Sequence, residues 1–270
     1  MSIATNNTLS TIATKRSPAQ RTTRQTLQTL NFIHRFRHVT AQHIQTSLQH
    51  AFLPTTLKQL AILCAKGYIA RQYDPQDRAS NRSASYYLTP KGLELLQMHN
   101  PKGKYRTSRS LKADTTMRLS QIERYNTLAD AYCHFKTHYD GQFEFSSAFD
   151  IAGLECMPDE IPDGYVRVTI PGTKTQHYFI EVYGWSRSTQ LQRRRIYSYL
   201  QFAESERWQS MTNEPSPSLF IIAGSTMSQK RLNAQLANNL KESLAYDFKV
   251  YTTSAPKLTS EDSAIWREIQ

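Results

Sequence analysis

The sequence predicts an α+β protein of two domains, in which a helical domain with a β-hairpin precedes a mixed α/β domain. Three observations predict this class. Apolar residues recur at helical spacing before the first strand-like segments appear. A chain of 270 residues is long enough to bury two modest cores. Excess positive charge is confined to residues 1–110, where 16 Lys and Arg stand against 3 acidic residues (+13), whereas residues 111–270 hold 17 against 19 (−2).

The N-terminal stretch, residues 1–24, is polar and carries scattered cations without apolar periodicity. We expect a disordered basic arm that either touches DNA or is an inert tail. No apolar run is long enough to cross a membrane, and the secretory-signal pattern is missing. The three cysteines have neither metal-ligand spacing nor a disulfide framework. These features predict a cytoplasmic protein without a membrane partner.

The domain predicted over residues 25–100 begins with two helices. Apolar residues at helical spacing mark the first, namely Leu27, Leu30 and Ile33. Thr40 is suited to the N-cap of the second, since a threonine hydroxyl can accept a hydrogen bond from the first turn. The two helices supply the base on which a third can pack.

The third helix is predicted between Pro54 and Gly67. Proline suits the first turn of a helix, where its missing N–H costs nothing, and glycine suits the position after the end. We expect its buried face to consist of residues at i, i+3, i+4 and i+7: Leu57, Leu60, Ala61 and Cys64.

A hairpin and a fourth helix complete the domain. Segments 68–73 and 85–88 are predicted strands joined by a polar turn, and Thr89 followed by Pro90 opens the last helix. Three helices, a hairpin and a helix in about 70 residues follow the plan of a winged helix, whose third helix enters the DNA major groove. Residues 101–110 are predicted to form a basic linker.

Two sets of residues are candidates for DNA contact in this fold. Base edges are assigned to the polar side of the third helix: Thr55, Thr56, Lys58 and Gln59. Phosphates are assigned to cations at the helix end and on the wing: Lys66, Arg78 and Arg82.

Residues 111–270 follow the order α-β-β-β-α-β-α-β, which predicts a mixed sheet flanked by helices. The continuous apolar segment 218–223 predicts a strand buried on both faces. A terminal helix is expected over residues 263–269.

Two carboxylates of this half are candidates for a metal site. A turn over 171–175 would place Asp163 opposite Tyr183, with Glu181 as a diagonal neighbour on the same face, roughly 7–8 Å away. Two carboxylates at that separation could hold a hard divalent cation such as Mg²⁺.

At this point the sequence resembles the replication-relaxation family of bacterial plasmids and mobile elements. The residues that carry the resemblance are Pro162-Asp163, YFIEVYGWSRST (178–189) and QRRRIYSYL (192–200). The resemblance covers about residues 25–225. It implies that the second domain, 111–270, is similar to the PD-(D/E)xK nuclease fold.

The sequence departs from the nuclease pattern at one position. The pattern has a lysine two residues after the second acidic residue, and this sequence has Tyr183 there. Nearby arginines stay protonated and are poor proton acceptors. The departure therefore predicts a degenerate domain without a cofactor. The densest charge of this half, Arg193, Arg194 and Arg195, is either a solvated helix face or a contact for phosphate or a partner.

The leading prediction is a protein that binds double-stranded DNA sequence-specifically. We expect it to bind nucleoid or plasmid DNA as a homodimer. It would act as a transcriptional regulator or accessory factor in replication, mobilisation or transfer of a mobile element. Two alternatives remain open. One is a Mg²⁺-dependent endonuclease or nickase that uses Asp163 and Glu181. The other is an adaptor that recruits a relaxase or replication protein.

Overall fold

The computed structural model describes residues 23–73, 82–139, 141–184, 188–241, 248–260 and 264–269. Most of the predicted arm and the wing tip, including Arg78, lie outside these residues. Among the described residues, no helix is long and apolar enough to cross a membrane.

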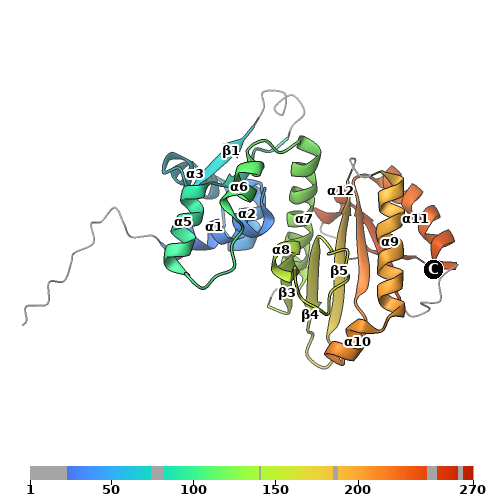
Figure 1. The fold of residues 1–270 in the computed structure, drawn as a ribbon. Helices are drawn as coiled ribbons and strands as arrows, with labels where there is room; N and C mark the ends of the chain where they lie inside the picture. The colour runs from blue at the N-terminus through green and yellow to red at the C-terminus, as the bar shows by residue number, and fades with distance from the viewer. Residues whose placement is uncertain are drawn as a thin grey trace, which may run out of the picture.

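The N-terminal half has the predicted order of three helices, a hairpin and a helix (Figure 1). Its helices are α1 (Arg24–Phe36), α2 (Ala41–Leu48), α3 (Leu53–Ala65) and α5 (Pro90–His99). Strands β1 (Ile69–Gln72) and β2 (Ser85–Leu88) pair antiparallel, and Val39 between α1 and α2 bridges to Tyr86 of β2.

Local sequence signals set the ends of these helices as predicted. The Thr40 hydroxyl accepts the N–H of His43, and the Thr89 hydroxyl accepts the N–H of Gly92. Gly67 follows α3 with φ 72°, a left-handed conformation that glycine adopts at low cost. The hairpin therefore leaves α3 at a fixed angle.

The C-terminal half is a six-stranded mixed sheet in the order β3-β4-β5-β6-β7-β8. Its strands are β3 (Phe143–Ser147), β4 (Gly164–Val168), β5 (Gln176–Tyr183), β6 (Ser218–Ala223), β7 (Val250–Ser254) and β8 (Arg267–Ile269). Strands β5, β6 and β7 run parallel to one another, and the other neighbouring pairs are antiparallel. The predicted mixed sheet is confirmed, and the apolar strand β6 lies inside it.

Helices cover both faces of the sheet. The long helix α7 (Leu119–His138) packs on one face, and α9 (Thr189–Glu204) and α11 (Thr226–Lys241) lie on the other (Figure 1). Short helices fill the connections: α6 (Ser108–Asp114), α8 (Ala148–Ile151), α10 (Arg207–Thr212) and α12 (Ala255–Leu258).

The expected terminal helix over 263–269 is wrong. Residues Arg267–Ile269 form β8, because Ile269 pairs with Val250 at the open edge of β7. Ile265 and Ile269 are four residues apart, a spacing that a helix would also allow.

The two halves share one hydrophobic core. Buried residues of α1, α2 and α5 form a continuous cluster with α7 and the α7 face of the sheet. Within the predicted linker 101–110, Arg106 is only 6% exposed and its backbone N–H donates to His34. Helix α6 already begins at Ser108, so the end of that stretch belongs to the packed junction rather than to an exposed basic connection.

Candidate nucleic-acid interface and carboxylate cluster

Helix α3 buries a different face from the one expected. Its buried residues are Thr56, Leu60 and Leu63, at 0%, 0% and 2% exposure. Leu57, which we expected inside, is 43% exposed. The apolar spacing fits two buried faces, one containing Leu57 and the other containing Leu63. The face with Leu63 is buried, and it brings Thr56 against a polar partner. The Thr56 hydroxyl bonds His50 Nδ1 at 2.7 Å, so an inward threonine costs little.

This rotation divides the predicted base-contacting residues. Thr55 and Lys58 are exposed, as is Lys66 just after the helix. Thr56 is buried, and Gln59 is half-buried with its amide donating to Thr29 Oγ1 at 3.1 Å. The assignment of Thr56 to a base edge is therefore wrong, and Gln59 is committed to α1.

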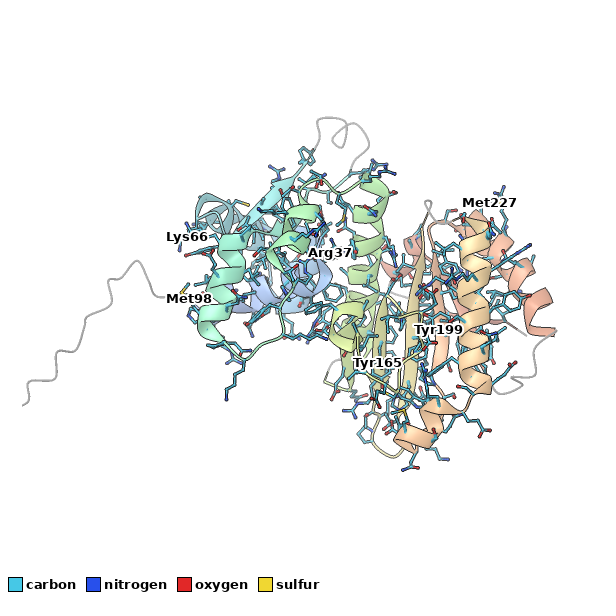
Figure 2. All side chains as sticks on the ribbon, viewed as in Figure 1. Arg37, Lys66, Met98, Tyr165, Tyr199 and Met227 are labelled. Atoms are coloured by element: carbon cyan, nitrogen blue, oxygen red, sulfur yellow. The ribbon has the colours of Figure 1, made fainter. Side chains whose placement is uncertain are left out.

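Four residues of α3 that the sequence analysis placed inside or did not assign are exposed: Leu57, Ala61, Ile62 and Ala65. We call six of the exposed residues the outer face of α3: Thr55, Lys58, Ala61, Ile62, Ala65 and Lys66. It lies on the side of the N-terminal half away from the sheet, and Figure 2 shows Lys66 at that outer edge. The sequence would have identified this face if α3 had been assigned the buried face that contains Leu60 and Leu63.

The base of the wing carries further cations. Arg82 is exposed and pairs with Glu123 of α7 at 3.4 Å. The Arg71 guanidinium lies 4.8 Å from the centre of the Tyr73 ring, and both side chains are exposed. Arg71 was not among the predicted contacts. The face of an aromatic ring attracts a cation, so Tyr73 favours this position of the Arg71 guanidinium.

The strand register brings the two candidate carboxylates together. Gly164 pairs with Ile180, so the next step places Asp163 opposite Glu181 rather than opposite Tyr183. The expected register was two residues off because β4 already ends at Val168, which pairs with Gln176, so the turn begins at Thr169 rather than at Pro171. An even shift keeps both residues on one side of the strands. Asp163 is 8% exposed and Glu181 is fully buried.

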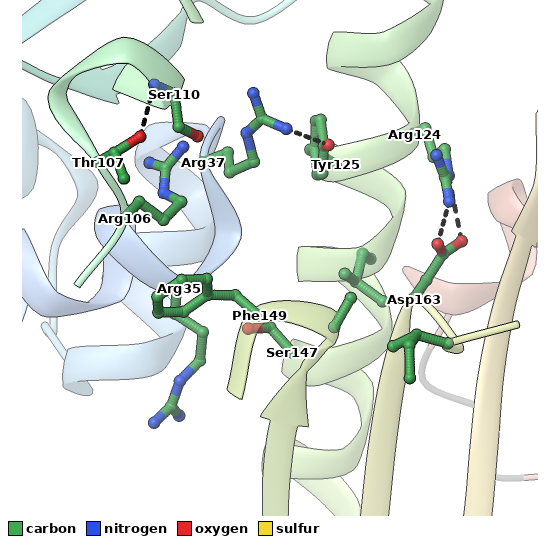
Figure 3. Close-up of a pocket in the computed structure, with 13 residues that line it drawn as sticks. Arg35, Arg37, Arg106, Thr107, Ser110, Arg124, Tyr125, Ser147, Phe149 and Asp163 are labelled. Atoms are coloured by element: carbon green, nitrogen blue, oxygen red, sulfur yellow. Dashed lines mark hydrogen bonds and ion pairs between the residues drawn. The ribbon is translucent and has the colours of Figure 1, made fainter. Parts of the chain in front are cut away.

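Each carboxylate is bound by an arginine from a different helix. Arg124 of α7 makes a two-nitrogen contact with Asp163, which also accepts the backbone N–H of Val182 at 2.9 Å (Figure 3). Arg195 of α9 donates to both oxygens of Glu181.

The Tyr199 hydroxyl adds a hydrogen bond of 2.5 Å to Glu181, from its place between the sheet and α9 (Figure 2). Burial, followed by the charge of Glu181, raises the pKa of Tyr199 well above its usual range. Burial acts to lower the pKa of Arg195, but the charge and hydrogen bonds of Glu181 outweigh it and raise that pKa. We call Asp163, Glu181, Arg124, Arg195 and Tyr199 the carboxylate–arginine cluster.

A divalent cation does not fit the cluster as it lies. All four carboxylate oxygens accept hydrogen bonds from protein groups, and two guanidinium charges offset the two carboxylates. Within the described part of the chain, no three His, Cys, Asp or Glu side chains gather as metal ligands. Tyr183, in the place of the pattern's lysine, is buried and points its hydroxyl at the Gln192 carbonyl.

The arginine run of α9 is split by its own helix. Arg195 is buried in the cluster and bonds Glu160 as well, so its assignment as a phosphate or partner contact is wrong. Arg194 has a 75% exposed side chain and pairs with Glu160 at 3.2 Å, and Arg193 is exposed. Only these two keep the predicted outward position.

The comparison with protein families agrees with the resemblance seen in the sequence. The replication-relaxation family matches residues 30–215, which is more than half of the chain. A solved structure, restriction endonuclease FokI, matches at 14% identity and a TM-score of 0.37, with 87% of this chain and 42% of that chain covered. This chain thus spans less than half the length of that enzyme. No curated protein matched the sequence.

Proposed function

Because the chain belongs to the replication-relaxation family, we propose that it is a sequence-specific DNA-binding protein rather than a nuclease. It would act as a regulator or accessory factor in the replication, mobilisation or transfer of a plasmid or other mobile element. The observation that carries this proposal is the outer face of α3, a solvent-exposed helix surface with cations and small side chains.

The dimensions and chemistry of this face suit a major groove. Thirteen residues make a helix of roughly 20 Å, and the groove of B-DNA admits one helix. Ala61 and Ala65 leave room for close approach, and Ile62 offers an apolar contact of the kind a thymine methyl group accepts. Thr55 and Lys58 can hydrogen-bond base edges or phosphates.

Phosphate contacts would come from Lys66 and the wing. Arg82 and Arg71 lie at the base of the hairpin that follows α3, where a wing meets the DNA backbone. The wing-tip Arg78 is proposed as a further contact. The excess positive charge of residues 1–110 also supports the N-terminal half as the part that faces DNA. Two copies on paired half-sites would raise affinity and specificity, so we propose a homodimer.

The carboxylate–arginine cluster argues against hydrolysis. A nuclease of this pattern needs carboxylates that are open to a metal and a lysine that can polarise water. Here guanidinium groups occupy the carboxylates and Tyr183 takes the lysine position. The second domain then serves as a scaffold that fixes the DNA-binding half through the shared core.

The experiment is a fluorescence-anisotropy titration of the full chain with DNA from upstream of its own gene and with scrambled DNA, at two salt concentrations. Lys58→Gln and Lys66→Gln should weaken binding to both DNAs and lower the salt slope by about 1 each. Thr55→Ala should mainly reduce the difference in binding affinity between the upstream DNA and the scrambled DNA. Lys230→Gln, which removes an exposed cation of α11 in the other half, is the matched control.

Two outcomes would replace this proposal. Nicking of supercoiled plasmid that requires Mg²⁺ and disappears in Asp163→Ala, while DNA binding persists, would establish the endonuclease. A failure to bind either DNA even at low salt, in a folded protein, would favour an adaptor that docks a relaxase or replication protein through the same face.

A further inference from the structure

A cavity of about 430 Å³ lies at the junction of the two halves (Figure 3). Arg37 and Arg106 line it from the N-terminal side, and Arg124 lines it from α7, with Phe149 of α8 at its base. The volume is within the range of small-molecule sites. The described function gives this cavity no role, since the outer face of α3 lies on the far side of the N-terminal half.

The cavity wall is strongly cationic. Four arginines line it, the three named above and Arg35, against one carboxylate, Asp163. Asp114 stands behind the wall, fully buried, and accepts hydrogen bonds from Arg37 Nε at 2.9 Å and Arg106 Nη1 at 2.7 Å. Counting these two carboxylates and Asp150, which pairs with Arg35 at 3.5 Å, the guanidinium groups retain a surplus of one charge.

Arg106 is the residue that points to a ligand. Its side chain is 5% exposed, and its Nη1 is used by Asp114. Its Nε and Nη2 are buried and have no hydrogen-bond partner in the described structure. These two nitrogens form one edge of the guanidinium, the edge that binds phosphate or carboxylate in a bidentate manner. A buried donor left unpaired costs free energy that an acceptor would recover.

The remaining wall suits a flat ring. Phe149 and Tyr125 both line the cavity, and the Arg37 guanidinium lies 4.7 Å from the centre of the Tyr125 ring. The hydroxyls of Thr107 and Ser110 lie beside Arg106 (Figure 3). Aromatic walls with a cationic end fit a base joined to a phosphate group.

We propose that this cavity binds a nucleoside phosphate. Its phosphate would lie at the free edge of Arg106, reached by a small turn of that side chain, with Arg35 as the second cation. Its base would pack against the half-buried Phe149 ring, because the Arg37 guanidinium already covers Tyr125. Because the wall is built from both halves, the bound ligand would brace the junction between them.

The test is isothermal titration calorimetry of the full chain with ADP, GDP, adenosine and inorganic pyrophosphate. We expect ADP or GDP to bind at least about tenfold more tightly than adenosine, the equivalent of one charge-assisted hydrogen bond. Arg106→Lys keeps a charge beside Asp114 but removes the two-nitrogen edge, and should weaken nucleotide binding about tenfold or more. Phe149→Ala should weaken the binding of ADP more than the binding of pyrophosphate. Arg194→Lys is the matched control and should bind as the unaltered protein does.

Arg35→Gln serves if Arg106→Lys fails to fold, because the Arg35 side chain is 43% exposed and tolerates change. It should weaken ADP binding several-fold. Absence of heat with all four compounds up to about 1 mM, a Kd range that corresponds to about 4 kcal/mol, would overturn the proposal. So would equal binding by a folded Arg106→Lys or Arg35→Gln and by Arg194→Lys.

Discussion

The outer face of α3 is open to solvent and the carboxylate–arginine cluster is buried, yet each contains a residue whose chain neighbour is of the same type and has the opposite exposure. On α3, Thr55 faces solvent while its neighbour Thr56 is buried against His50. On α9, Arg194 faces solvent while its neighbour Arg195 is buried against Glu181. One residue of each pair is available to a partner and the other is used by the fold. Residue type alone does not tell which, since the helix rotation decides it.

The largest effect is expected inside the cluster. Glu181→Gln should lower the free energy of unfolding by about 4 kcal/mol, because Arg195 loses the partner that offsets its buried charge. Urea denaturation followed by circular dichroism measures this. The double variant Glu181→Leu with Arg195→Met should recover most of the loss, since it removes both charges. A loss below about 1 kcal/mol in Glu181→Gln would show that the pair is dispensable and weaken the contrast with α3.

Acid should act on the packed junction, because two buried histidines stand there. Burial lowers the pKa of His34 and of His38 to about 4, from an ordinary value near 6.5. His34 accepts the N–H of Arg106, and the two ring nitrogens of His38 lie 3.2 Å from Ser85 Oγ and the Asp114 carbonyl. The unfolded state binds protons first, so stability is full above pH 6.5 and is lost as the pH falls toward 4.

Between pH 7 and pH 5 each histidine should cost about 2 kcal/mol of stability. His38→Gln should flatten the measured dependence of unfolding free energy on pH over this window, whereas Thr55→Val, a change on the outer face of α3, should keep the slope of the unaltered protein. The outer face of α3 has no histidine, so changes there should not alter how stability depends on pH, whereas changes at the packed junction should. Equal slopes in the two variants would contradict the role of His38.

A smaller effect should separate the paired threonines. Thr56→Val should cost about 1–2 kcal/mol in urea denaturation, because it breaks a buried hydrogen bond and leaves His50 short of a partner. Thr55→Val should change stability by less than about 0.5 kcal/mol. In DNA titrations the order should reverse, with the Thr55 variant losing preference for the cognate sequence. If both variants alter DNA preference equally, the outer face has been assigned incorrectly.

The sequence was informative wherever a local signal decides a local structure. Thr40, Gly67 and Thr89 marked helix ends correctly, and the order of the main helices and strands as far as β7 followed from periodicity. The rotation of α3 was missed because Leu57 and Leu63 are both apolar and only the partner of Thr56 tells them apart.

The long-range pairings between arginines and carboxylates were not predicted, for a similar reason. The carboxylates were found, but their arginines come from helices 39 residues before Asp163 and 14 residues after Glu181. No spacing rule joins such distant positions. Arg106 sat in a stretch that composition alone describes as a linker, and its burial depends on His34, which is 72 residues away.

The smallest effect concerns the base of the wing, next to α7. Glu123 of α7 pairs with Arg82 at 3.4 Å, and both side chains are more than a third exposed. Such pairs contribute little, so Glu123→Gln should change the unfolding free energy by less than about 0.5 kcal/mol. It also removes a negative charge beside a proposed phosphate contact. DNA affinity at low salt should therefore rise about two- to threefold and the rise should vanish at high salt, because exposed charges are screened. Glu94→Gln, an exposed acid on α5, is the control. A fall in affinity would mean that Glu123 holds Arg82 in its binding position, and α7 would then take part in DNA recognition instead of only supporting it.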